Sequence, residues 1–253
     1  MKKQIGAQYY TIRQHCQTLE DFEESCRKVK EIGYQVVQLS GIGNFSGEEV
    51  KAVLDKYNLT CACTHRGRVN YLEHLDEEIA FHRTIGCDIC GIGSMPGLNA
   101  KVETIESFVK KFGPVCEKLE KEGLIFAYHN HAFEFEKIDG KYAFEILFEK
   151  MPYKNFKLIL DVYWLAFAGV NPAKFIRDYK DYIACIHFKD LKIVDNTQKF
   201  AEIGQGNLDW DDIISASYES SAAYALVEQD TCDGDPFDAL KVSYDFLKER
   251  GFE

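Results

Sequence analysis

The sequence predicts an α/β fold of the (β/α)8 barrel type, and three observations support this prediction. Short apolar segments alternate with segments of helical spacing, no linker or low-complexity stretch breaks the alternation, and the chain has 253 residues. Strands that alternate with helices form parallel sheets through right-handed crossovers. Eight such units close into a barrel at a length of about 250 residues. We therefore expect one domain that spans residues 1–253.

Eight apolar segments are the candidate strands. They are residues 6–10, 36–39, 59–64, 88–93, 124–128, 156–160, 183–186 and 224–227. After the first strand, residues 19–29 have the apolar spacing of a helix, and Gly33 stands where that helix would end. Residues 46–49 have the character of the acidic first turn of a second helix, which is expected to continue to about Tyr57.

The later helices are predicted in the same way. Residues 72–84 and 103–121 have helical spacing, and each segment is followed within two residues by a glycine, which is common after the end of a helix. A last helix is expected over residues 237–250. The alternative fold is an open doubly wound sheet, which usually carries a glycine-rich phosphate-binding turn after its first strand. Residues 9–13 contain no glycine, so the closed barrel is favoured.

Composition and charge limit the classes of partner. The formal net charge of −11 disfavours nucleic acid and anionic membranes, because both attract basic surfaces. No apolar run approaches the length of about 20 residues that a membrane helix needs, and the first residues lack the apolar run of a signal peptide. We therefore expect a cytoplasmic protein whose nine cysteines are reduced. Cys61, Cys63, Cys87 and Cys90 are interpreted as buried thiols and not as metal ligands.

Side chains that can bind a metal follow the last four candidate strands. They are His129, His131 and Glu134 after the fifth strand, Asp161 after the sixth, His187 after the seventh and Glu228 after the eighth. The carboxyl ends of all strands in a parallel barrel face one rim, so these side chains are expected to converge. Carboxylates and imidazoles without thiolates suit Mn²⁺, Mg²⁺, Co²⁺ or Zn²⁺. The sequence therefore predicts one divalent metal ion as a cofactor.

Five short motifs around these positions resemble those of a known family. They are Tyr-His-Asn-His-Ala-Phe-Glu-Phe at 128–135, Leu-Asp-Val-Tyr-Trp at 160–164, His-Phe-Lys-Asp at 187–190, Gly-Gln-Gly-Asn-Leu-Asp-Trp at 204–210 and Val-Glu-Gln-Asp at 227–230. The chain is similar to the sugar phosphate isomerase/epimerase family. That family belongs to the xylose isomerase-like TIM barrels, beside inosose dehydratase, ketose 3-epimerases, hydroxypyruvate isomerase and a DNA-repair endonuclease.

The resemblance implies one divalent metal held by Glu, Asp, His and Glu from strands five to eight. Asp161, His187 and Glu228 match the last three ligands. At the end of strand five, where the epimerases have Glu, this chain has His129. We expect the nearest carboxylate, Glu134, to be the fourth ligand, with His129 or His131 as substitutes. In the ketose epimerases a His follows the strand-six Asp by three residues, and this chain has Trp164 there.

The resemblance also implies roles in catalysis and substrate binding. The expected catalytic residues are Glu228, which is ligand and candidate base, His129 and His131, which are candidates for general acid or base, and Lys189, which would steady an oxyanion or a hydroxyl. The expected substrate contacts are His65 with Arg66 and Arg68, Trp164, Glu202, and Tyr9 with Tyr10.

The function expected from the resemblance is a metal-dependent isomerase or epimerase that acts on a small sugar, keto-sugar or sugar phosphate. The reaction would remove an α-proton and pass through a metal-stabilised enediolate. Two alternatives stay open: a dehydratase of inosose or 3-keto-sugar type, and a non-catalytic sugar-binding barrel. A DNA-repair endonuclease is disfavoured by the seven histidines and the charge of −11. The expected partner is therefore a small sugar or polyol, with a homodimer or homotetramer expected by analogy.

Overall fold

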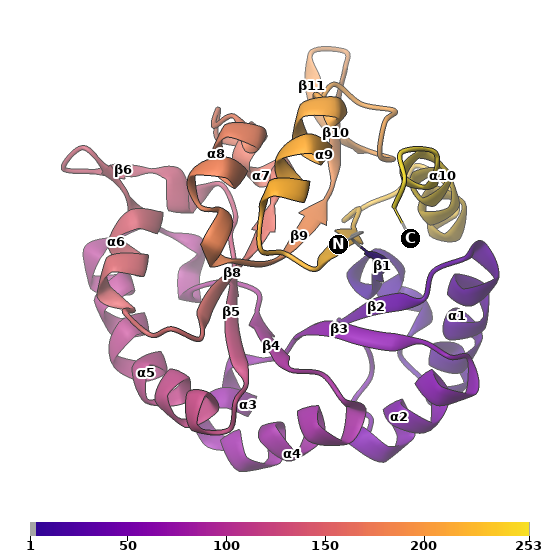
Figure 1. Ribbon diagram of the computed structural model, residues 1–253, viewed down its shortest axis with the longest axis horizontal. Coiled ribbons are helices and arrows are strands. Elements are labelled where there is room, and N and C mark those ends of the chain that lie inside the picture. The colour runs from indigo at the N-terminus through magenta and orange to yellow at the C-terminus, as the bar shows by residue number, and fades with distance from the viewer. Residues whose placement is uncertain (1–3, 253) are drawn as a thin grey trace.

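The computed structural model describes residues 4–252 and confirms the predicted barrel. Eight parallel strands form one sheet in the order β3-β2-β1-β12-β9-β8-β5-β4, and helices surround it (Figure 1). The strands are β1 Gln4–Gln8, β2 Val36–Ser40, β3 Thr60–His65, β4 Ile89–Ile92, β5 Ile125–His129, β8 Phe156–Asp161, β9 Ile183–Phe188 and β12 Tyr224–Val227. All eight predicted strands are therefore present, with shifted ends.

The helices are α1 Leu19–Ile32, α2 Gly47–Lys56, α3 Arg68–Glu73, α4 Leu75–Ile85, α5 Val102–Lys121, α6 Ala143–Lys150, α7 Val162–Phe167, α8 Pro172–Asp178, α9 Trp210–Glu219 and α10 Pro236–Glu249. The five helices predicted with bounds are present with shifted ends, but the predicted helix 72–84 is divided at His74, where α3 ends and α4 begins. At the start of α2, Ser46 and Glu49 form a reciprocal capping box. Gly33 ends α1 with a φ of 126°. Within the described residues, none of the helices is both long and apolar enough to cross a membrane.

The barrel closes between β3 and β4 by a close approach of the two backbones. Here Arg66 N donates a hydrogen bond to Gly91 O at 3.0 Å, and the Tyr71 hydroxyl donates to the same oxygen at 2.9 Å. A Cβ atom on Gly91 would lie 2.0 Å from Thr64 O, a distance that no side chain tolerates. Gly91 is therefore required for closure of the barrel between β3 and β4. Arg66, which follows β3 and bonds to Gly91, lies at the rim of the barrel.

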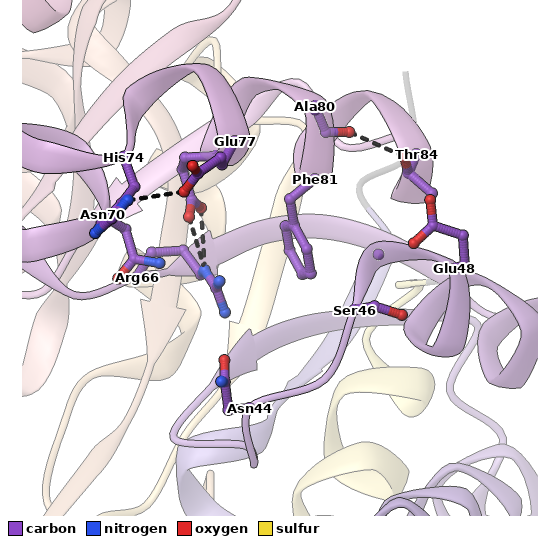
Figure 2. A pocket seen from close by; sticks show the side chains of 12 residues that line it. Asn44, Ser46, Glu48, Arg66, Asn70, His74, Glu77, Ala80, Phe81 and Thr84 are labelled. Atoms are coloured by element: carbon purple, nitrogen blue, oxygen red, sulfur yellow. Dashed lines mark hydrogen bonds and ion pairs between the residues drawn. The ribbon is translucent and has the colours of Figure 1, made fainter.

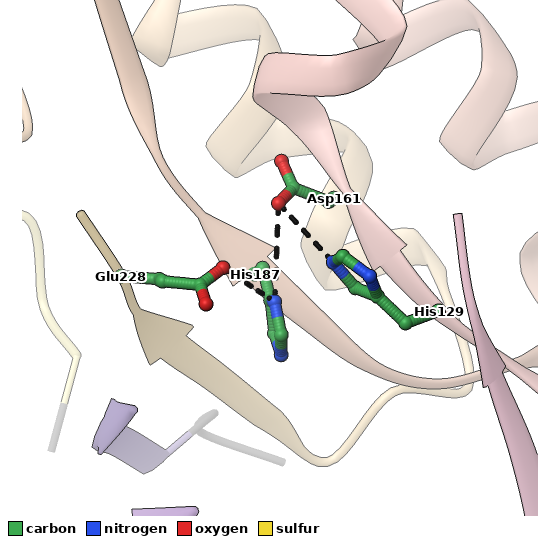
Figure 3. Close-up of side chains that lie close together, drawn as sticks. All are labelled: His129, Asp161, His187 and Glu228. Atoms are coloured by element: carbon green, nitrogen blue, oxygen red, sulfur yellow. Dashed lines mark hydrogen bonds and ion pairs between the residues drawn. The ribbon is translucent and has the colours of Figure 1, made fainter. Parts of the chain in front are cut away.

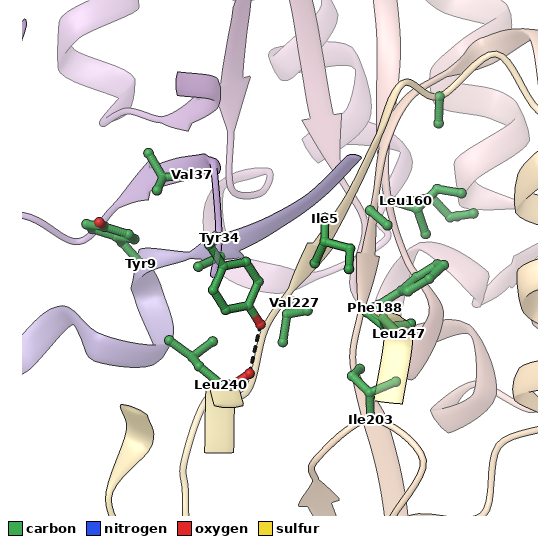
Figure 4. Close-up of a cluster of buried hydrophobic side chains, with 14 of the residues drawn as sticks. Ile5, Tyr9, Tyr34, Val37, Leu160, Phe188, Ile203, Val227, Leu240 and Leu247 are labelled. Atoms are coloured by element: carbon green, nitrogen blue, oxygen red, sulfur yellow. Dashed lines mark hydrogen bonds between the residues drawn. The ribbon is translucent and has the colours of Figure 1, made fainter. Parts of the chain in front are cut away.

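Apolar side chains fill the barrel interior and the layer between strands and helices. One buried cluster fills the barrel interior, and its members come from seven of the eight strands: Val36, Ala62, Cys63, Ile89, Ala127, Ile159, Cys185 and Leu226. The largest cluster lies outside the sheet, where the Tyr34 hydroxyl donates to Leu240 O at 2.9 Å (Figure 4). All nine cysteines are free and all except Cys232 are buried, so the prediction of buried thiols is confirmed.

The structure differs from the prediction at the first strand and in two hairpins. Residues 9 and 10 lie in a 3₁₀ helix, Tyr9–His15, and not in β1, because the Gln8 side chain accepts a hydrogen bond from Tyr10 N at 2.9 Å. The unpredicted hairpins are β6 Lys137–Ile138 with β7 Lys141–Tyr142, and β10 Asp190–Val194 with β11 Thr197–Ala201. The second hairpin follows β9 directly and projects away from the barrel strands (Figure 1).

Candidate metal centre

Four side chains from the carboxyl ends of β5, β8, β9 and β12 meet at the rim of the barrel. They are His129, Asp161, His187 and Glu228, all buried, and their ligand atoms lie within 4.8 Å of one another (Figure 3). His129 Nε2 is 3.3 Å from Asp161 Oδ2, and His187 Nδ1 is 2.9 Å from Glu228 Oε2. The structure thus brings Asp161, His187 and Glu228 together and adds His129 from β5.

The two oxygens of Asp161 have separate tasks. Oδ1 accepts hydrogen bonds from Tyr163 N at 2.9 Å and Trp164 N at 3.3 Å, and so caps α7. The Asp161 backbone is held in turn, since its N–H donates to Asn130 Oδ1 at 2.9 Å. Oδ2 therefore faces the centre on a carboxylate that cannot rotate freely, as a preorganised ligand requires.

The second ring nitrogen of each histidine donates a hydrogen bond to an oxygen outside the centre. His129 Nδ1 lies 3.2 Å from Gly93 O, and His187 Nε2 lies 2.6 Å from Gln38 Oε1. Because these oxygens only accept hydrogen bonds, the ring hydrogens are assigned to those nitrogens. His129 Nε2 and His187 Nδ1 then present lone pairs to carboxylate oxygens. Lone pairs that face one another in this way call for a cation between them, and outward ring bonds of this kind are typical of metal-binding histidines.

A buried lysine lies against the same carboxylates. Lys189 Nζ is 3.4 Å from Asp161 Oδ2, 3.4 Å from Glu228 Oε2 and 2.7 Å from Asp230 Oδ1. The rings of Tyr163, Trp164 and Phe200 surround it at 5.1 to 5.5 Å. Three carboxylates thus face one ammonium group, and the excess of negative charge leaves the centre suited to a divalent cation.

The pKa values of these groups follow from burial and from their neighbours. Burial alone would raise the pKa of Asp161 and of Glu228, but the nearby ammonium group of Lys189 favours the ionised carboxylates, and both pKa values are lowered. Burial alone would lower the pKa of Lys189, but Asp161, Glu228 and Asp230 raise it above its ordinary value. The centre therefore combines ionised carboxylates with a charged lysine at neutral pH.

A cavity of about 460 Å³ opens beside the centre. Its lining includes His129, Lys189 and Glu228, together with His65, His131, Trp164, Tyr10 and Asp230. Burial is the largest cause that lowers the pKa of His131 to about 3, and burial also lowers the pKa of His65. Both rings are therefore neutral near pH 7. The buried His131 Nδ1 and His65 Nε2 have no hydrogen-bond partner within residues 4–252, and both rings border the cavity.

The expectation that Glu134 is the fourth ligand needs correction. Residues Phe133–Phe135 form a 3₁₀ turn that folds the Glu134 carboxylate back against the end of β5. There Oε1 accepts from the Tyr128 hydroxyl at 2.6 Å and Oε2 accepts from His131 N at 2.8 Å. His129, one of the two substitutes considered for this ligand, takes the fourth position. Glu134 instead fixes the backbone that presents the two histidines.

Three of the expected substrate contacts, Tyr9, Glu202 and Arg68, do not line the cavity. Tyr9 is fully buried in the core, with its hydroxyl 3.2 Å from Cys26 Sγ. The neighbouring Tyr10 lines the cavity in its place, because the 3₁₀ helix after β1 turns Tyr9 inward. Glu202 follows β11 and is not among the residues that line the cavity. His65 and Trp164 do line the cavity, and so does Arg66.

The glycine-containing motif at 204–210 is organised by Asp190, the last residue of the His-Phe-Lys-Asp motif. The buried Asp190 Oδ2 accepts from Gly204 N at 2.9 Å, Gly206 N at 3.0 Å and Trp210 Nε1 at 2.6 Å. A Cβ atom on Gly206 would lie 2.4 Å from Asp190 Oδ1, so the glycine is needed for the loop to reach the carboxylate. The motif is therefore part of the scaffold of the rim.

Replacement of Glu134 by Gln is expected to change the pH dependence of stability. Burial raises the pKa of Glu134 from 4.5 to about 7. Between these values the unfolded chain releases a proton that the folded chain keeps, so the stability of the wild type falls as pH rises. Glu134→Gln has no carboxyl group that titrates at this position, so it should not lose stability in this way. Its free energy of unfolding relative to that of wild type should therefore increase by at most about 3 kcal/mol between pH 4.5 and 8.

Urea denaturation across this pH range measures the effect. Glu136→Gln, which changes an exposed residue two positions away, is the control and should run parallel to wild type. A Glu134→Gln curve that is also parallel to wild type would show that the carboxyl titrates normally.

Comparisons with known proteins agree with this architecture. A family model described as "Xylose isomerase-like TIM barrel" matches residues 26–249. No curated protein sequence gives a significant match. Among solved structures, a sugar phosphate isomerase/epimerase from Parabacteroides distasonis superposes with a TM-score of 0.80 at 20% identity, over 100% of this chain and 96% of that one.

Two further solved structures have different printed activities. The probable 3-DHS dehydratase involved in petrobactin synthesis from Bacillus anthracis has a TM-score of 0.79 at 13% identity, with 98% of this chain and 100% of that one covered. A D-allulose 3-epimerase from Methylomonas sp. has a TM-score of 0.77 at 14% identity, with 99% of each chain covered. The TM-scores show that these proteins share a fold with this chain. The sequence identities are too low to indicate a reaction.

Proposed function

Since this chain belongs to the family of xylose isomerase-like TIM barrels, we propose that it is a metal-dependent isomerase or epimerase of a small sugar, keto-sugar or sugar phosphate. The observation that carries the proposal is the inward-facing set of His129, Asp161, His187 and Glu228 beside a cavity of sugar size. These four residues would hold one divalent ion. The ion would withdraw electron density from a carbonyl oxygen and a neighbouring hydroxyl oxygen. The hydrogen on the carbon that bears this hydroxyl, next to the carbonyl, would thereby become more acidic.

The residues around the cavity supply the other tasks of such a reaction. Glu228 Oε2 and the neutral, unpartnered His131 Nδ1 are the candidate groups for taking and returning the proton. Lys189, locked between carboxylates and rings, would donate a hydrogen bond to a substrate hydroxyl or oxyanion. His65 and the indole of Trp164 would line the bound sugar. Return of the proton to the opposite face gives epimerisation, and return to the next carbon gives isomerisation.

Dehydration is the second candidate reaction. The ketose epimerases have a second His three residues after the strand-six Asp, and here the indole of Trp164 lies over Lys189 Nζ at 5.2 Å instead. Because an indole cannot take or return a proton there, and the ammonium group of Lys189 beside it could protonate a departing β-hydroxyl, loss of water would compete with return of the proton. A sugar-binding barrel without catalysis is the third reading, and metal content separates it from the other two.

Incubation of keto-sugars, keto-sugar phosphates and inososes with the Mn²⁺-loaded protein in D₂O tests the proposal. We expect deuterium at a carbon next to a carbonyl in at least one compound, and we expect EDTA to remove the activity. The identity of the product separates epimerisation, isomerisation and loss of water. No exchange in any compound, together with no rise in melting temperature on addition of Mn²⁺, would leave only the non-catalytic reading.

A further inference from the structure

A second cavity lies beside the one at the metal centre, at the carboxyl ends of β2 and β3. It has a volume of about 340 Å³ and is lined by residues 39–44 at and after the end of β2, residues 65–67 at and after the end of β3, Asn70 and Phe81. Ser40, His65, Arg66 and Gly67 line both this cavity and the one at the metal centre. The two spaces therefore adjoin one another, with these four residues at their border.

Arg66 is held rigidly at the junction of the two cavities. Its Nε donates to both oxygens of Glu78, at 3.0 and 3.1 Å, and its guanidinium lies 4.3 Å from the centre of the Phe81 ring. The side chains of Arg66 and Glu78 are 18% and 1% exposed, so the pair is shielded from water. Two such contacts fix the plane of the guanidinium and leave little side-chain entropy to lose on binding.

The terminal amino groups of Arg66 have no partner among residues 4–252. Only Nε is used by Glu78, and Figure 2 shows the free end of the guanidinium facing Asn44. An arginine whose two Nη groups are free and whose plane is fixed presents the fork that matches a phosphate or carboxylate.

The charges around the second cavity favour an anion. In a chain with 41 Asp and Glu residues, the described residues that line this cavity include no carboxylate, and Arg66 is their cation. Ser40, Asn44 and Asn70 add neutral polar groups. On the outer side, Arg66 also borders a groove that contains Glu48, Glu77 and Glu78. That side repels anions, so an anionic group would reach Arg66 from the metal-centre side.

We propose that Arg66, fixed by Glu78 and Phe81, forms an oxyanion subsite that binds the phosphate or carboxylate of the substrate at the end remote from the metal. The inference rests on the proposed function, since it assigns an anionic sugar or polyol to the same active site. Arg66 is a specificity residue in this assignment, and Glu78 is a positioning residue.

Binding of unreactive polyols tests the subsite without catalysis. The probes are D-glucitol 6-phosphate, D-gluconate and neutral D-glucitol, measured by calorimetry at constant ionic strength, with Mn²⁺ and after treatment with EDTA. We expect wild type to bind at least one anionic probe about tenfold or more tightly than D-glucitol, with or without metal. The two anionic probes distinguish a phosphate subsite from a carboxylate subsite.

Variants attribute the preference to Arg66. Arg66→Lys keeps the ion pair with Glu78 but loses the fork, and should lose most of the preference. The double variant Arg66→Gln with Glu78→Gln leaves no buried charge unpaired and should bind all three probes equally. Arg83→Gln, on the same helix α4 as Glu78 and half-exposed, is the matched control and should keep the wild-type preference. Melting temperatures verify that each variant is folded.

The outcomes of this test and of the test of function are separate. Equal binding of all probes by wild type, or a preference that survives in the folded double variant, overturns the subsite. An anion preference that disappears with EDTA in wild type would place the anion on the metal and also overturns the assignment to Arg66. Absence of proton exchange in every sugar, with the Arg66-dependent preference intact, would overturn the proposed reaction and keep the subsite.

Discussion

Replacement of His187 by Ala, or of Glu228 by Gln, should abolish tight Mn²⁺ binding and catalytic activity while the barrel stays folded. Each change removes one of the four inward-facing donors, and neither residue belongs to the apolar clusters that fill the barrel. Loss of an outer partner of a ligand already weakens metal binding by about 10- to 100-fold, so loss of a ligand should cost at least about 100-fold. Calorimetric titration with Mn²⁺ measures the loss.

The control for these variants is His74→Ala, because the His74 side chain is half-exposed and pairs with Glu77 at the surface. It should bind Mn²⁺ as wild type does, and circular dichroism should show the same helical content in all three variants. Wild-type affinity and wild-type rates in both His187→Ala and Glu228→Gln would refute the metal centre.

Lys189→Met should destabilise the metal-free protein by about 3 to 5 kcal/mol, the cost of removing one partner from a buried set of charges. Without the ammonium group, Asp161, Glu228 and Asp230 would face one another with no lysine to balance them. A divalent ion restores positive charge at the same oxygens, so Mn²⁺ should recover a large part of the loss. Urea denaturation with EDTA and with Mn²⁺ separates the two contributions.

Lys192→Met is the matched control, since Lys192 lies on the β10–β11 hairpin and pairs with the exposed Asp233. It should change stability by less than about 1 kcal/mol. A Lys189→Met protein as stable as wild type in EDTA would mean that the three carboxylates are not held close together by this lysine.

The fold could be predicted from the sequence because buried parallel strands are short apolar runs between helices. This pattern located every strand of the barrel, and the prediction failed where local contacts decide the backbone. Tyr9 and Tyr10 continue an apolar run, but the Gln8 side chain starts a 3₁₀ helix there. The β10–β11 hairpin has no continuous apolar run, and its turn at Asp195 and Asn196, with φ values of 49° and 57°, was its only local signal.

The candidate site was predictable to the extent that it depends on strand ends. Asp161, His187 and Glu228 each lie within one residue of the last position of a strand, so the topology alone brings them together. Glu134 was chosen because it is the nearest carboxylate, and the sequence does not show that the Tyr128 hydroxyl binds it. The fixing of Arg66 by Glu78 was equally hidden, because it joins the residue after β3 to a residue on α4 and the two have no common motif.

The role of Asp190 affects how relatives of this protein should be grouped. The residues that hold the 204–210 loop form a hydrogen-bonded corner of the rim and do not line the cavity. Proteins that share the 204–210 sequence motif therefore share this loop structure at the rim, whatever compound they convert. Classification by reaction would be better founded on the side chains that follow β2 and β3, where neighbouring chains can differ without disturbing the corner.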